Sequence, residues 1–180
     1  MTSTVVASKI AELELKGFGL AQARLQYVPQ MMELINKFAS QGEMLPRSQS
    51  ELYENIRDFI VVKRGDEIAA CASLHVLWDD LAEIKSVAVS ETLQGQGIGA
   101  LLVEQCIDDA VELGLPTVFV LTHKPGFYEK LGFERADVLE FPRKVWSECI
   151  RCPKFPSCNE IAMSRSVTTL LPVGPLPTEE

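Results

Sequence analysis

Residues 94–99 read Gln94-Gly95-Gln96-Gly97-Ile98-Gly99, and this glycine-rich stretch decides the fold of the 180-residue chain. It joins an apolar segment at 81–89 (LAEIKSVAV) to a segment whose apolar residues recur at helical spacing. Glycines allow backbone amides to converge, and the amides and dipole of a helix N-terminus favour a phosphate. The spacing G-x-G-x-G is neither the Rossmann fingerprint nor a P-loop. The stretch alone predicts either a phosphate-binding loop or a plain tight turn between strand and helix.

The segments before this loop predict two helices and four strands, the last three of them an antiparallel meander. Helices are expected at 28–39 and 48–55, and strands at 20–27, 59–63, 67–78 and 81–89. Pro29 suits the first turn of the first helix, and Ser48 with Glu51 three residues later is typical of a capped start of the second.

After the loop, a helix ending at Gly114 is followed by a short helix and three strands. The helix is expected at 125–130, and the strands at 117–122, from 133 onward and at 160–165. We expect residues 1–17 to be a lead-in, 18–168 to form one domain, and the proline-rich 169–180 to be a disordered tail.

Composition excludes several classes of protein. The net charge of −8 makes a nucleic-acid partner unexpected, because Lys and Arg supply most of the affinity for phosphate backbones. No apolar run approaches the roughly 20 residues of a membrane span, so no membrane partner is expected. Charged residues in the first twenty positions argue against a signal peptide, and the expected location is cytoplasmic. Anionic ligands would need local attraction from an Arg, a Lys or a helix N-terminus.

Two motifs at a fixed separation resemble one family. Gln94, Gly97 and Gly99 fit the Q-x-x-G-x-G loop of Gcn5-related N-acetyltransferases (GNAT), and 127–133 (FYEKLGF) matches the FYxxxGF segment of that family. The order of the expected elements over roughly 20–165 is also similar. The resemblance implies an α+β (or α/β) GNAT fold, a mixed, mostly antiparallel central sheet with helices on both faces. It also implies acetyl-CoA as co-substrate, with no metal.

Within that family, four segments look like the short bacterial N-acetylglutamate synthases: 44–48, 51–59, 81–89 and 144–146. This resemblance implies acetyl transfer to the α-amine of L-glutamate, the first step of arginine biosynthesis, and it allows a homodimer. His123 stands where an aromatic residue is usual and Lys85 where Arg is usual, which leaves the amino-acid preference open. The alternatives are an acetyltransferase for another amine and a catalytically silent acetyl-CoA-binding module.

The resemblance places the coenzyme between the fourth and fifth strands of the fold. Backbone groups of Val87, Ala88 and Val89 would bind the pantetheine arm. The pyrophosphate would lie on the loop formed by Gln94, Gly95, Gln96, Gly97, Ile98 and Gly99.

Two residues are candidates for proton transfer. Glu83 is the expected general base, and it shares a strand face with Lys85 because the two are two residues apart. The alternative is a solvent-exposed ion pair of little energetic value. Tyr128 is the expected general acid for the departing thiolate, and the alternative is an aromatic ring that only packs under the coenzyme arm.

A substrate with two carboxylates needs two cations. Arg47 and Lys85 are the expected pair, with Ser48 or Ser86 as neutral donors and Lys144, beside Arg143, as a further cation. The alternatives are a capping or surface ion-pair role for Arg47 and a solvated basic turn at 143–144.

Cys149, Cys152 and Cys158 form C-x2-C-x5-C, one ligand short of a structural zinc site. His123 is a conceivable fourth ligand that nothing in the sequence places nearby. A redox disulfide and buried structural cysteines are the other interpretations, and the last is preferred.

Overall fold

A seven-stranded sheet organises the chain in the computed structural model, which describes residues 4–141, 149–152, 154 and 157–167. Its strand order is β1-β2-β3-β4-β5-β7-β6. The strands are β1 Gly19–Gln22, β2 Phe59–Arg64, β3 Glu67–Trp78, β4 Leu81–Val89, β5 Thr117–Thr122, β6 Glu134–Arg135 and β7 Ile161–Ser166. Among the described strands, only β4 and β5 pair in parallel, which confirms the expected mixed, mostly antiparallel sheet.

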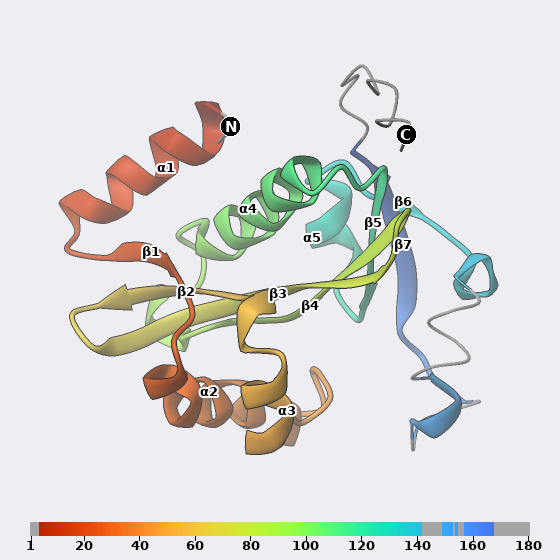
Figure 1. The fold of residues 1–180 in the computed structure, drawn as a ribbon, viewed down its shortest axis with the longest axis horizontal. Coiled ribbons are helices and arrows are strands. Elements are labelled where there is room, and N and C mark those ends of the chain that lie inside the picture. Colours follow the sequence, from red (N-terminus) through yellow and green to blue (C-terminus); the bar gives the residue numbers. More distant parts are fainter. Residues whose placement is uncertain (1–3, 142–148, 153, 155–156, 168–180) are drawn as a thin grey trace, which may run out of the picture.

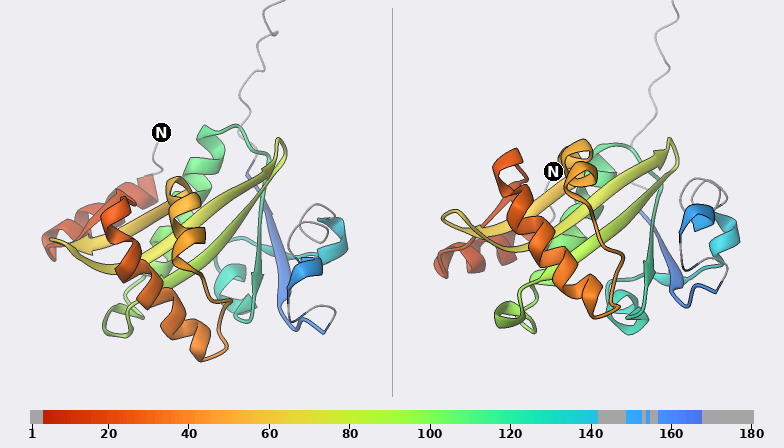
Figure 2. Two further views of the ribbon diagram at one scale, coloured as in Figure 1. Left: turned by 60° about the horizontal axis from the view of Figure 1, so that its bottom comes forward. Right: turned by 90° about the horizontal axis from the view of Figure 1, so that it is seen from below.

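Helices cover both faces of this sheet (Figure 1). One face carries α1 Thr4–Leu15 and α4 Ile98–Glu112, and α5 Pro125–Glu129 follows β5. The opposite face carries α2 Val28–Ser40 and α3 Gln49–Glu54, as Figure 2 shows from below. Short 3₁₀ turns occupy Leu25–Tyr27, Ile56–Asp58, Glu91–Leu93, Val138–Glu140 and Cys149–Arg151. The expected arrangement of helices on both faces is confirmed.

Local sequence explains the two helices beside the candidate site. Helix α2 buries Val28, Met31, Ile35 and Phe38 at three- and four-residue spacing against the sheet. Helix α3 begins with the expected capping box: the backbone amide of Glu51 donates to the Ser48 hydroxyl (3.2 Å), and the Ser48 amide donates to the Glu51 carboxylate (2.7 Å).

The parallel pair β4–β5 is short. Its register pairs are Leu81 with Thr117, Ala82 with Val118 and Glu83 with Phe119, and they stop there although both strands continue. On its other side β5 pairs with β7 along its whole length. The two parallel strands therefore separate after Glu83, while β5 stays in the sheet through β7. The two strands therefore leave a gap beyond Glu83, between the strands where the resemblance places the coenzyme.

The N-terminal strand is shorter than expected. The strand expected at 20–27 ends at Gln22, because a turn in which the Tyr27 amide donates to the Arg24 carbonyl (2.9 Å) leads directly into α2. The described part of the lead-in at 1–17 contains α1, whose Val6 and Leu13 are buried in the core shared with α4. The expected tail at 169–180 lies outside the described residues. Among the described helices, none has the length and apolar character needed to cross a bilayer.

Candidate active site

A cavity of about 610 Å³ opens where β4 and β5 separate. It brings together residues from both strands, from the glycine-rich loop and from the connection between α2 and α3. Of the expected site residues, its lining includes Arg47, Glu83, Lys85, Ser86, Val87, Ala88, Val89, Gln94, Gly95, Gly97, Ile98, Gly99 and Tyr128. Gln96 lies outside it, in a smaller hollow beside α1, and Lys144 belongs to 142–148, outside the described residues.

The glycine-rich loop is held by its own glutamine side chains. Gln94 donates from Nε2 to the carbonyl of Val89 (3.0 Å), and Gln96 donates to the carbonyl of Thr92 (3.2 Å). Gly95 (φ +75°) and Gly97 (φ +80°, the N-cap of α4) adopt left-handed conformations that favour glycine. The loop thus presents the N-terminus of α4, whose first amides have no intrahelical acceptors, to the cavity.

A cation that the sequence did not single out lies against this loop. A Cβ atom placed on Gly97 would be only 2.8 Å from Nζ of Lys9, a half-buried residue of α1. The residues of the loop itself carry no charge. Helix α1 therefore brings a positive charge to the glycine-rich loop.

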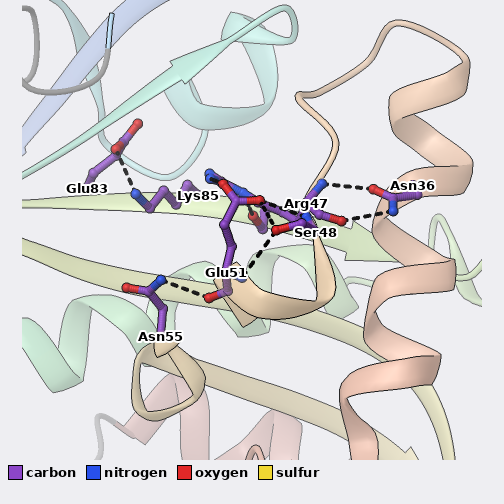
Figure 3. A network of polar contacts seen from close by, with 8 residues as sticks. Asn36, Arg47, Ser48, Glu51, Asn55, Glu83 and Lys85 are labelled. Atoms are coloured by element: carbon purple, nitrogen blue, oxygen red, sulfur yellow. Dashed lines mark hydrogen bonds and ion pairs between the residues drawn. The ribbon is translucent and has the colours of Figure 1, made fainter. Parts of the chain in front are cut away.

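Glu83 lies at the last register pair before the strands diverge, and the residue as a whole is only 3% exposed. Lys85 Nζ is 3.6 Å from Glu83 Oε2, so both side chains share a face as expected (Figure 3). Glu83 is buried and Lys85 is half-buried, with side-chain exposures of 4% and 16%, so the pair does not lie open to solvent. A carboxylate at this position can accept a proton from a group held in the cavity.

Arg47 reaches the same region from the connection between α2 and α3. Its Nε donates to the Ser86 hydroxyl (3.4 Å), and its Nη1 is 3.8 Å from Glu51 Oε1 (Figure 3). Hydrogen bonds from Ser48 hold the pKa of the Glu51 carboxyl below its usual range. Glu51 therefore remains an anion beside Arg47, and the two cations Arg47 and Lys85 line one cavity.

Ser86 stands at an irregularity of β4. Cys71 pairs with Ala88 while Ser73 pairs with Lys85, so three steps of β4 face two of β3. Ser86 takes up the difference with φ +55°, the one left-handed non-glycine among the described residues. The thiol of Cys71 donates to the Ser86 carbonyl (3.7 Å), and burial raises the pKa of this thiol to about 12, so that it stays protonated.

Tyr128 lines the cavity with a ring that is 7% exposed. It packs edge-on against Phe127 and Phe133, with ring centroids 4.9 and 5.4 Å apart. Burial raises the pKa of the phenol well above its usual value, so Tyr128 remains a proton donor across the neutral range. The ring therefore meets the requirements of both roles expected for it, packing and proton donation.

The cysteines form part of the cavity wall instead of a buried core. Cys149 and Cys152 are half-buried and Cys158 is exposed, which corrects the preferred interpretation of buried structural cysteines. Cys158 Sγ donates to Glu160 (3.7 Å), and Glu160 lies 3.8 Å from His123 Nε2. Within the described residues, no three acidic, His or Cys side chains are grouped to hold a metal ion.

Sequence comparison places this architecture among known proteins. The acetyltransferase (GNAT) family model matches residues 28–133, which include α4, the glycine-rich loop and both strands that border the cavity. An uncharacterized N-acetyltransferase of Chlorobaculum tepidum is 37% identical over 145 residues, covering 81% of this chain and 94% of that protein. An amino-acid acetyltransferase of Mycobacterium tuberculosis is 34% identical over 133 residues, covering 72% of this chain and 76% of that protein.

Solved structures give the same result. A Mycobacterium tuberculosis protein in complex with CoA and NLQ superimposes with a TM-score of 0.71 and 29% identity, covering 82% of this chain and 98% of that one. N-acetylglutamate synthase from Neisseria gonorrhoeae, complexed with coenzyme A and N-acetyl-glutamate, superimposes with a TM-score of 0.74 and 26% sequence identity, covering 84% of this chain. Only 35% of that longer chain is covered.

The backbone at Ser86 can be tested by two substitutions. Ser86→Gly should be more stable than Ser86→Ala by about 1 kcal/mol, because a left-handed conformation costs an L-residue about 1–2 kcal/mol and glycine little. Both variants lose the same hydroxyl contact with Arg47, so their difference reports the backbone alone. Urea unfolding measures it, and equal midpoints would show that residue 86 is not held in this conformation in solution.

Proposed function

The chain belongs to the acetyltransferase (GNAT) family, and from this premise we propose that it transfers the acetyl group of acetyl-CoA to the α-amine of L-glutamate. The observation that carries the proposal is the placement of two cations, Arg47 and Lys85, in one cavity with the buried carboxylate of Glu83. An amino acid with two carboxylates needs both charges, and its amine needs a proton acceptor nearby. The Mycobacterium tuberculosis relative, named an amino-acid acetyltransferase, supports this acceptor class.

The coenzyme fits the chain along the diverging strands. Val87, Ala88 and Val89 present backbone on the side of β4 that β5 has left, where an extended pantetheine arm can bind in place of a strand. The loop from Gln94 to Gly99 offers amides and a helix N-terminus to the pyrophosphate. The CoA complexes of the two structural neighbours support this use of the cleft.

The residues then divide the reaction between them. Glu83 takes a proton from the bound ammonium, directly or through water, and the free amine attacks the thioester carbonyl. A C–N bond forms, the nitrogen releases its second proton to water, and the C–S bond breaks. Tyr128 is placed to protonate the departing thiolate and regains its proton from water. Arg47 and Lys85 hold the two carboxylates of the acceptor, and much of the acceleration comes from holding both substrates in attack geometry.

Acceptor preference tests the proposed function. Release of CoA thiol from acetyl-CoA should be measured against a panel of free amino acids and cationic amines. L-Glutamate should exceed L-glutamine in kcat/KM by about 30-fold, the lower end of the effect of leaving a buried charge without its partner. We expect the lower end because Glu51 and Glu83 remain beside the two cations. Equal efficiency on both, or preference for a cationic amine, would contradict glutamate as the acceptor.

The role of Glu83 predicts a pH-dependent defect. Glu83→Gln should lower kcat about 100-fold or more at pH 7 with little change in acetyl-CoA affinity. The deficit should shrink as pH rises, because the acceptor amine then loses its proton unaided. Glu43→Gln is a matched control, since Glu43 also lines the cavity but accepts a hydrogen bond from Lys124 (2.7 Å). A Glu83→Gln enzyme with wild-type turnover at pH 7 would remove this residue from proton transfer.

The position of Lys9 predicts a contribution to coenzyme affinity. Lys9→Gln should weaken acetyl-CoA binding about two- to five-fold, the range of a partly exposed ion pair, and reduce its salt dependence. Lys16→Gln removes the same charge from the residue that directly follows α1, but Lys16 is bonded to Glu12 (2.9 Å), so this variant should have no effect. Calorimetry with acetyl-CoA and with acetyl-pantetheine, which has no phosphates, separates the effect of Lys9 on phosphate binding from its effect on binding of the pantetheine arm. Equal weakening of both ligands would contradict a phosphate contact.

A further inference from the structure

Asn36 of α2 holds the backbone of Arg47 at two points. The Arg47 amide donates to Oδ1 of Asn36 (2.9 Å), and Nδ2 of Asn36 donates to the Arg47 carbonyl (3.0 Å) (Figure 3). Asn36 is half-buried, so water competes only partly for these groups. The Asn36 side chain thereby satisfies both the backbone N–H and the backbone C=O of Arg47, as a neighbouring strand would in a sheet.

The position of Arg47 in the chain explains why its backbone contact with Asn36 affects the direction of its guanidinium. Arg47 belongs to the connection between α2 and α3 and directly precedes Ser48, the N-cap of α3. Its side chain is long and flexible, so the direction of the guanidinium depends on a fixed starting point in the backbone. The capping box fixes the residue that follows Arg47, and Asn36 fixes Arg47 itself against α2.

We propose that Asn36 is a positioning residue that determines acceptor affinity through Arg47. The inference rests on the proposed function, in which the Arg47 guanidinium binds a carboxylate of the acceptor. Within the part of the chain that the structure describes, the Asn36 side chain forms its hydrogen bonds with the Arg47 backbone and none with the coenzyme loop or Glu83. Without it, Arg47 samples other backbone conformations and is in binding geometry for a smaller fraction of the time.

Asn36→Ala should raise the KM for the acceptor about ten-fold and leave kcat at saturating acceptor and the KM for acetyl-CoA unchanged. Alanine is a better helix former than asparagine, so α2 is not weakened by the change. Asn36→Gln keeps both hydrogen-bonding groups one methylene further out and should recover part of the loss. Ser40→Ala is the matched control, because the Ser40 hydroxyl donates to the Lys37 carbonyl (2.7 Å) of its own helix.

A double-mutant cycle distinguishes positioning from general destabilisation. Arg47→Ala should itself raise the acceptor KM steeply, and adding Asn36→Ala to it should change that KM no further, because Asn36 acts only through Arg47. Equal effects of Asn36→Ala in both backgrounds, or a wild-type acceptor KM in Asn36→Ala, would overturn the inference. An unchanged acceptor KM in Arg47→Ala would overturn it as well.

Hydrogen exchange provides a readout that is independent of turnover. The Arg47 amide should be protected in the wild-type protein and exchange at least several-fold faster in Asn36→Ala, while amides of β4 keep their protection. An Arg47 amide that exchanges equally fast in both proteins would show that the contact does not exist in solution. Failure of the proposed function has a different signature, a wild-type enzyme inactive with L-glutamate, and the kinetic series would then use the best acceptor of the panel.

Discussion

The separation of β4 and β5 after the pair Glu83–Phe119 is the constraint on which the rest of the structure depends. Each strand is paired with another neighbour on its other side, β4 with β3 and β5 with β7, so neither can bend back to close the gap. Beyond Glu83 the edge of β4 that faces the gap has no register pairs with β5, so a ligand with an extended amide chain can take the place of a strand there. The cavity is therefore a consequence of sheet topology, and the side chains only determine what chemistry takes place in it.

Much of this architecture follows from the sequence because local and non-local signals agree. The bounds of β3, β4 and β5 match the alternation and apolar runs that predicted them, and the capping box of α3 formed as Ser48 and Glu51 indicated. The contacts of Asn36 with Arg47 and of Lys9 with Gly97 had no such signal, because each joins segments whose approach depends on tertiary packing. The strand predicted at 20–27 is longer than β1. The alternation of apolar and polar residues continues past Gln22, but the residues before α2 form a turn instead of a strand.

An acidic chain that takes anionic substrates must create positive potential locally. The net charge of −8 repels anions at a distance, and this repulsion is weak beyond about 8–10 Å at physiological salt. Among the described residues that line the cavity, Arg47 before α3, Lys85 on β4 and the N-terminus of α4 supply positive potential. Each cation keeps a carboxylate beside it, Glu51 or Glu83, which limits the cost of holding the charge in a partly buried cavity without ligand.

The irregularity at Ser86 explains how one strand serves both the core and the chemistry. Before it, Ala82 and Ile84 point into the core under α4, and Glu83 and Lys85 point to the opposite face, where Arg47 lies. After it the alternation is inverted: Ala88 joins the core under α2, while the valines at 87 and 89 pack toward α4. A shift of one residue exchanges the two faces of a strand. With regular pairing, the two valines would lie on the same face as Glu83, Lys85 and Arg47, and Ala88 would point away from α2. The left-handed backbone of Ser86 thus keeps the polar side chains of Glu83 and Lys85 at the end of the cavity where β4 and β5 begin to separate.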